Sequence, residues 1–179
     1  MCIRDRRSRA ATKQDNRSCP AITVANRSPN NGELLPMSDD LEDLRQWFRT
    51  WGACVAAVDF ERARPLFSDD VVGFGTHAAF VVGLDALQKE QWQKIWPNIT
   101  AFRFRVDDLV GAVDGNAAWA AVPWTSIGYN EDGTAFDRPG RATVTFRKVS
   151  GRWLGTHTHF SLNPGVPPRT HGARPAGPS

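Results

Sequence analysis

Apolar residues recur at helical spacing in three segments of the chain, and each segment carries a start or stop signal. Ser38 precedes two acidic residues that open the first segment, where negative side chains stabilise a helix N-terminus. Asp59 is suited to cap the second segment, and Pro97 ends the third because proline cannot continue a helix. The predicted helices are residues 38–58, 60–67 and 84–96.

Alternation of apolar and polar residues predicts strands in the other segments. A short hairpin is expected around His77, after a turn at Ser68 to Asp70, and Asp114-Gly115-Asn116 forms another hairpin turn. The predicted strands are residues 71–74, 79–82, 102–113, 117–127, 140–149 and 152–162. This order, α-α-β-β-α-β-β-β-β, predicts an α+β fold in which a curved antiparallel sheet is folded over three N-terminal helices.

The two ends of the chain follow neither pattern. Residues 1–36 are rich in Arg, Asn, Ser and Pro, and the opening Met1-Cys2-Ile3-Arg4-Asp5-Arg6 resembles the translation of a sequencing adapter. We therefore expect residues 1–36 to be a disordered or artefactual extension, with Met37 as the native start. The domain is expected over residues 37–165, and residues 166–179 form a Pro/Gly-rich tail that is expected to be disordered.

Charge and cysteine content narrow the classes of function. The chain has a formal net charge of +3, but residues 1–36 hold seven basic and three acidic residues, which leaves a net charge of −1 elsewhere. A nearly neutral domain does not favour nucleic-acid binding, and no apolar run is long enough to span a membrane. The cysteines, Cys2, Cys19 and Cys54, have no paired spacing, which argues against a disulfide framework and favours a cytoplasmic protein.

Two histidines in the last predicted strand are the most informative candidates. His157 and His159 are two residues apart, so their side chains point to the same face, roughly 7 Å from each other. Trp153 and Ser161 share this face, whereas the opposite face carries apolar side chains between Leu154 and Leu162. Hydrophobicity alone would bury that opposite face, so the pattern is divided.

Three kinds of role are open to this pair. His157 and His159 could act as general acid and base near neutral pH, or hold a carboxylate or enolate oxygen. They could also be a hydrogen-bonded structural pair without any chemistry. A metal site would need a third ligand, for which His77 or Asp137 is available, but no further ligand spacing is present, and we expect no metal.

Other polar and aromatic residues could contribute to a ligand site. Arg141 and Arg138 could pair bidentately with an acidic ligand, although solvated strand faces are the commoner place for arginines. Trp47 and Trp51 could form walls for a flat apolar ligand, or simply be core residues on a helix. His77 could face a pocket mouth or be an exposed residue in a turn.

Three short motifs support the same fold as the order of elements. They are Leu66-Phe67-Ser68-Asp69-Asp70-Val71, Gly83-Leu84-Asp85-Ala86-Leu87 and Gly151-Arg152-Trp153…His157-Thr158-His159-Phe160-Ser161. Together they resemble the nuclear transport factor 2-like superfamily, most closely its SnoaL-like branch of polyketide cyclase and ketosteroid isomerase type. The resemblance implies a cystatin-like cone that encloses a pocket, with the Trp/His face of the last strand inside and a homodimer formed through the convex sheet. The association domain of calcium/calmodulin-dependent kinase, a non-catalytic member, has a similar last strand.

The chain departs from the ketosteroid isomerases in two respects. The position of their general base falls at about Gly75, and the only tyrosine, Tyr129, lies in a loop rather than on the first helix. Ketosteroid isomerase activity is therefore not expected, and the fold itself does not determine another activity.

Two hypotheses follow. In the first, the domain binds a small hydrophobic or carbonyl compound in a conical pocket and performs cofactor-free acid/base catalysis of isomerase, hydratase or cyclase type. Its catalytic residues would be His157 and His159, and its ligand-binding residues Trp153, Ser161, Arg141, Trp47, Trp51 and His77. In the second, it is a non-catalytic dimerisation or ligand-sensing module. A free cavity beside the histidines favours the first, and a pocket filled by Trp and Phe favours the second.

Overall fold

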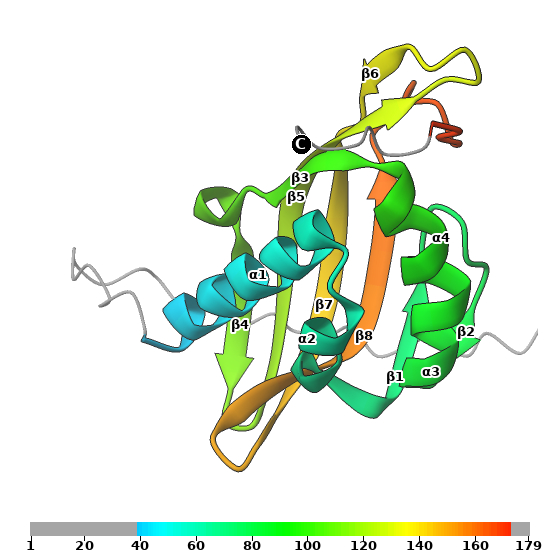
Figure 1. Cartoon of the computed structure of the whole chain (residues 1–179). Helices are drawn as coiled ribbons and strands as arrows, with labels where there is room; N and C mark the ends of the chain where they lie inside the picture. The colour runs from blue at the N-terminus through cyan, green and yellow to red at the C-terminus, as the bar shows by residue number, and fades with distance from the viewer. Residues whose placement is uncertain (1–38, 173–179) are drawn as a thin grey trace, which may run out of the picture. The chain divides into compact units, whose positions relative to one another are not determined.

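The structure, a computed structural model, describes residues 39–172, and the predicted extension of residues 1–36 lies outside this range (Figure 1). All three predicted helical segments are present. The first is α1 (Asp39–Ala57). The second is α2 (Phe60–Ala63) with a 3₁₀ turn at Arg64–Leu66, and Asp59 caps it by accepting a hydrogen bond from the backbone N–H of Arg62 at 3.0 Å. The third comprises α3 (Leu84–Leu87), a π-helical turn at Gln88–Trp92, α4 (Gln93–Ile95) and a 3₁₀ turn at Trp96–Asn98.

One curved sheet forms the rest of the domain. Its strands are β1 (Phe67–Phe74), β2 (Val81–Val82), β3 (Thr100–Phe104), β4 (Val110–Asp114), β5 (Ala117–Tyr129), β6 (Ala135–Asp137), β7 (Gly140–Val149) and β8 (Arg152–Leu162). The strand order is β2-β1-β8-β7-β5-β3, and β4 and β6 also pair with β5. Only β1 and β8 run parallel among these pairs. The described helices cover one face of the sheet (Figure 1), which confirms the predicted α+β class.

Two details of the prediction are wrong. The expected turn at Ser68 to Asp70 is part of β1, and the single strand expected over residues 102–113 is two strands. A 3₁₀ turn at Val106–Asp108 separates β3 from β4, so the two strands pair with different stretches of β5. The turn is held by the backbone N–H of Asp108, which donates to the carbonyl oxygen of Arg105 at 3.0 Å. The consecutive acids Asp107 and Asp108 interrupt the alternation at this position, and the single predicted strand passed over that signal.

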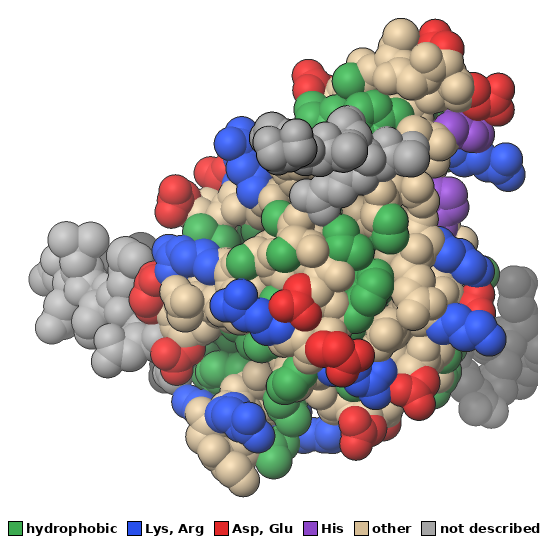
Figure 2. Space-filling model, viewed as in Figure 1, with side chains coloured by type: hydrophobic (Ala, Val, Ile, Leu, Met, Phe, Trp, Pro, Cys, Tyr) green, Lys and Arg blue, Asp and Glu red, His purple; other side chains and the backbone are tan. Residues whose placement is uncertain are grey.

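An aromatic core lies between the helices and the sheet. Trp47 of α1 packs edge to face against Phe67 and Phe146, with ring centroids 5.2 and 4.9 Å apart. Trp51, one turn later, contacts Phe67 at 5.0 Å. These contacts hold α1 across the sheet, because aromatic side chains bury large areas and prefer such edge contacts. On the helix side of the surface, acidic and basic side chains are interspersed (Figure 2).

An extra residue in β8 exchanges the faces of this strand. Phe146 of β7 pairs with Gly155, but the preceding residue of β7, Thr145, pairs with His157, so Thr156 has no partner of its own. This is a β-bulge, which inserts one residue into the alternation. The Thr156 hydroxyl donates to the carbonyl oxygen of Thr145 at 3.1 Å, which satisfies a polar group at the irregularity.

The segment after β8 returns to the sheet beyond the expected end of the domain at residue 165. The backbone N–H of Tyr129 donates to the Thr170 hydroxyl at 2.8 Å, and the His171 N–H donates to the Tyr129 carbonyl oxygen at 2.7 Å. The Thr170 hydroxyl also donates to the Asn98 carbonyl oxygen at 3.0 Å. These bonds run against the predicted disorder for Thr170 and His171, while residues 173–179 lie outside the described part.

Two smaller observations complete the description. No helix within residues 39–172 is long and apolar enough to cross a membrane. Cys54 is a buried free thiol in α1, as its apolar surroundings predict, and Cys2 and Cys19 lie outside the described residues.

Candidate functional site

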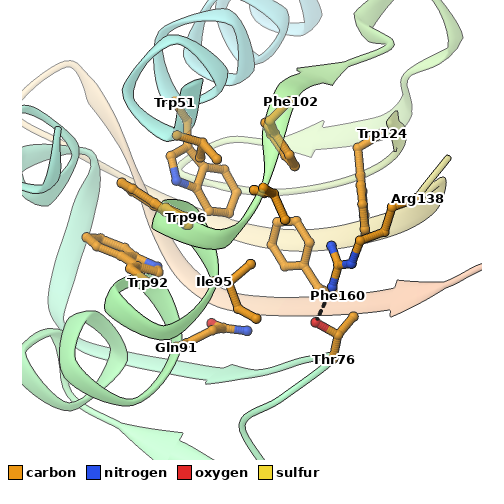
Figure 3. Close-up of a pocket in the computed structure, with 12 residues that line it drawn as sticks. Trp51, Thr76, Gln91, Trp92, Ile95, Trp96, Phe102, Trp124, Arg138 and Phe160 are labelled. Atoms are coloured by element: carbon orange, nitrogen blue, oxygen red, sulfur yellow. Dashed lines mark hydrogen bonds between the residues drawn. The ribbon is translucent and has the colours of Figure 1, made fainter. Parts of the chain in front are cut away.

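A cavity opens between the helices and the sheet (Figure 3). The space within it that can hold a water molecule measures about 40 Å³, and all the empty space between its lining atoms, including open solvent, about 440 Å³. It is lined by Trp51, Val55, Thr76, Gln91, Trp92, Ile95, Trp96, Ile99, Phe102, Trp124, Arg138 and Phe160. The lining comes from α1, the third helical segment and the residue that follows it, three strands and two loops, so only the complete fold assembles it.

Arg138 is the one charged residue in this lining. It follows β6, where its backbone N–H and carbonyl oxygen pair with Ser126 at 2.8 and 3.1 Å. Its side chain is only 2% exposed and lies with the guanidinium carbon 5.3 Å from the ring centroid of Trp124. The guanidinium donates one hydrogen bond, from Nη2 to the Thr76 hydroxyl at 3.0 Å, while its buried Nε has no acceptor among the described residues. Most of the five N–H groups of this arginine therefore have no acceptor within residues 39–172.

The charge of Arg138 is desolvated without being balanced. Burial lowers the pKa of Arg138 well below its usual range, to about 10, and no described carboxylate opposes this effect. The group is still a cation at neutral pH. A shift of this size corresponds to about 3 kcal/mol of lost solvation for the charged form. Buried charges normally have a partner, so an unbalanced one beside a cavity indicates an anion site.

The other polar side chains of the lining are neutral. Gln91 is 8% exposed, and its amide lies so close to the backbone of Gly75 that a Cβ there would overlap it. Thr76 adjoins it in the loop between β1 and β2 and accepts from Arg138. The indole N–H groups of Trp51 and Trp124 are buried without an acceptor. The cavity thus offers donors, and its lining includes no Asp, Glu, His, Cys, Lys or Tyr.

The histidine pair lies on the outer face of the sheet, away from this cavity. His157 Nδ1 is 3.0 Å from the Val72 carbonyl oxygen, and both imidazoles contact the ring of Phe74, with centroids 5.0 and 4.5 Å apart. The prediction that the Trp/His face points into the cone is therefore wrong for His157 and His159. The bulge at Thr156 is the cause, because it turns Phe160 inward and the histidines outward. Their catalytic role stays an untested prediction.

The three predicted tryptophans are all buried, but only Trp51 lines the cavity. Trp47 belongs to the core and donates from its indole to the Leu66 carbonyl oxygen at 3.1 Å. Trp153 lies against Phe146, with ring centroids 6.5 Å apart. Both residues stabilise the fold rather than contact the cavity.

The remaining predicted ligand-binding residues lie outside the cavity as well. Ser161 pairs with Arg141 across β7 and β8, and Arg141 is exposed and donates to the Leu162 carbonyl oxygen at 3.3 Å. His77 is exposed in the loop between β1 and β2, next to Thr76. Burial, followed by the positive charge of Arg138, lowers the pKa of His77. The described residues assemble no group of three potential metal ligands, either here or elsewhere.

The comparisons with known proteins agree with the fold. The sequence model of one protein family, the SnoaL-like domain, matches residues 44–164. The structure is similar to a nuclear transport factor 2-like superfamily protein from Salmonella enterica, with a TM-score of 0.60, 18% identity, and coverage of 70% of this chain and 94% of that one. It is also similar to an NTF2-like protein with a cystatin-like fold from Novosphingobium aromaticivorans, with a TM-score of 0.57, 18% identity, and coverage of 72% and 84%.

A third similar structure is the association domain of C. elegans CaMKII, with a TM-score of 0.54, 16% identity, and coverage of 69% of this chain and 95% of that one. None of the curated proteins matches the chain. Identities this low establish a shared fold and carry no activity across. The family model, in contrast, covers more than half of the chain, and the SnoaL-like resemblance predicted from the sequence is confirmed: the protein belongs to the SnoaL-like domain family.

Proposed function

We propose that this SnoaL-like domain binds a small acidic molecule whose carboxylate pairs with Arg138 inside the cavity. One observation carries the proposal: Arg138 is 2% exposed, has no described carboxylate partner and lines an aromatic cavity. A bound carboxylate would accept N–H groups that the protein leaves unused. It would also balance a charge that is otherwise desolvated, and hydrogen bonds between charged partners are stronger than neutral ones.

Ligand binding is favoured over acid/base catalysis in this cavity. A general acid or base must titrate near the working pH and reach the reacting atom, and none of the cavity's polar residues, Thr76, Gln91 and Arg138, meets the first condition. An isomerase, hydratase or cyclase reaction at His157 and His159 would take place on the opposite face of the sheet. We therefore assign the domain to the ligand-binding or ligand-sensing class.

The test compares acids with their amides. Isothermal titration of the full chain with benzoate and butyrate is expected to show binding, whereas benzamide and butyramide bind at least about tenfold more weakly, because they lack the charge. Arg138→Gln should weaken benzoate binding by about 30-fold or more, consistent with loss of a hydrogen bond to a charged group. Arg141→Gln, on the exposed outer face, is the matched control and should change the affinity by less than twofold. Equal binding of acid and amide would refute the proposal.

We also propose that the outer face of the sheet joins two copies of the chain. Val110 and Trp119 are 60% and 46% exposed, and β4 and β5 place them side by side, since Ala112 pairs with Trp119 and Val110 with Ala121. No described helix covers this face. Exposed apolar side chains on the open face of a sheet are typical of a contact surface, and the similar C. elegans structure is itself called an association domain.

Trp119→Glu should convert the protein from dimer to monomer, because a carboxylate would be buried without a partner in the contact. Light scattering coupled to size exclusion would measure the mass at several concentrations. Ala53→Glu places the same charge at an exposed position on α1 and should leave the dimer intact. A wild-type mass equal to one chain at every concentration would rule out this arrangement.

A further inference from the structure

The cavity has a polar region and a much larger aromatic region. The polar side chains Thr76, Gln91 and Arg138 gather on the side near the loop between β1 and β2 (Figure 3). Six of the twelve lining residues are aromatic, and they fill most of the rest: Trp51, Trp92, Trp96, Phe102, Trp124 and Phe160. A ligand whose carboxylate lies at Arg138 must therefore place the remainder of its structure among aromatic rings.

These rings come from three directions. Trp92 and Trp96 of the third helical segment are stacked, with centroids 4.9 Å apart and planes 18° apart. Phe102 and Trp124 form a second stack on β3 and β5, at 5.7 Å and 29°. Phe160 of β8 meets Trp51 edge on, at 5.3 Å and 87°. The wall rings contact one another, and a flat ring that enters among them would make stacked and edge contacts at once, which a puckered aliphatic ring of similar volume does not.

The lining also limits the charge and size of the ligand. Arg138 is the only ionised side chain among the twelve, so the cavity balances one negative charge and leaves a second one desolvated. The space of about 40 Å³ is far below the roughly 300–1,000 Å³ of pockets for drug-sized ligands, so the ligand must be small. Entry of a single ring already requires side chains of the lining to move, and a fused pair of rings requires larger movements.

We infer that the preferred ligand is an aromatic acid with one ring and one carboxylate. This inference rests on the proposed function, since it assumes that the carboxylate pairs with Arg138. It adds the chemistry of the other end of the molecule, which the walls of stacked and edge-on rings select.

The test titrates the full chain with four acids: benzoate, cyclohexanecarboxylate, 2-naphthoate and phthalate. Benzoate is expected to bind about 2- to 10-fold more tightly than cyclohexanecarboxylate, the range that an aromatic contact adds beyond area burial. Naphthoate and phthalate should bind more weakly than benzoate, because of the second ring and the second charge. Quenching of tryptophan fluorescence by benzoate provides a second readout of ring contact.

A pair of variants separates the cavity from the surface. Trp96→Leu should bring the benzoate preference over cyclohexanecarboxylate close to one, whereas Trp119→Leu, at the exposed tryptophan of the outer face, should leave it unchanged. If Trp96→Leu does not fold, the four acids on the wild-type chain decide alone. Cyclohexanecarboxylate equal to or tighter than benzoate would overturn this inference and leave the proposed function standing. Acids no better than their amides would overturn both.

Discussion

Replacing Arg138 with methionine will stabilise the folded domain by about 1–3 kcal/mol and abolish carboxylate binding. Arg138 is 2% exposed, burial lowers its pKa to about 10, and within the described part of the chain its guanidinium donates one hydrogen bond, to Thr76. Methionine is flexible and apolar, so it can fill the space beside Trp124 without a charge to desolvate. Urea denaturation gives the change in unfolding free energy, and calorimetry with benzoate gives the loss of binding.

The control is Arg141→Met, which removes an exposed arginine and should change stability by no more than about 0.5 kcal/mol. If Arg138→Met raises the free energy of unfolding and also weakens benzoate binding, then Arg138 is a residue that is kept for its ligand and not for stability. A loss of more than about 1 kcal/mol in Arg138→Met would mean that native contacts with Trp124 and Thr76 outweigh the desolvation of the charge.

Gly140→Ala will destabilise the domain by about 3 kcal/mol or more. A Cβ at this position would overlap the ring of Trp124 and the carbonyl oxygen of Ser161, and the latter belongs to the backbone of β8 and cannot rotate away. Overpacking of this kind typically costs about 1–3 kcal/mol, and more where backbone must move. Because Trp124 is also a wall of the cavity, we expect benzoate binding to weaken in parallel.

Gly52→Ala is the matched substitution with the opposite expected sign. Gly52 lies within α1, where a Cβ would be 3.4 Å from the ring of Phe104, an ordinary contact distance. Alanine favours the helix over glycine by about 1 kcal/mol, so this variant should gain stability. Urea midpoints for the two variants, measured side by side, check both signs. Equal effects would mean that local crowding does not decide the outcome at these glycines.

The sequence predicts the sheet well where tight turns bracket regular alternation. The predicted limits of β7 and β8 are those of the structure, because Ser150-Gly151 joins the two strands and both positions adopt positive φ, at 50° and 79°. The bulge at Thr156 could not be placed in the same way. The sequence signalled it only through the divided pattern of β8. Trp153, at an odd-numbered position, is buried, and Phe160, at an even-numbered position, packs against the core, which one regular strand cannot achieve.

The candidate site was harder to predict because it depends on tertiary position. Arg138 and Arg141 are three residues apart and chemically identical, yet one is buried in the cavity and the other is exposed. The difference arises at Arg138, whose backbone pairs with Ser126 in β5 while its side chain reaches the loop at Thr76. Gln91 lies one position before Trp92 and four before Ile95. Helical spacing therefore places it on the same buried face as these two residues, and the sequence could have indicated that it lines the cavity.

The bulge also defines how readily this scaffold can change its chemistry. The parity of every residue after Thr156 depends on that one insertion, because strand side chains alternate with a period of two. Deleting the codon of Thr156 would bring both imidazoles to the inner face and turn Phe160 outward, with no other side chain changed. The length of β8, and not only the identity of its side chains, therefore determines which of its residues line the cavity.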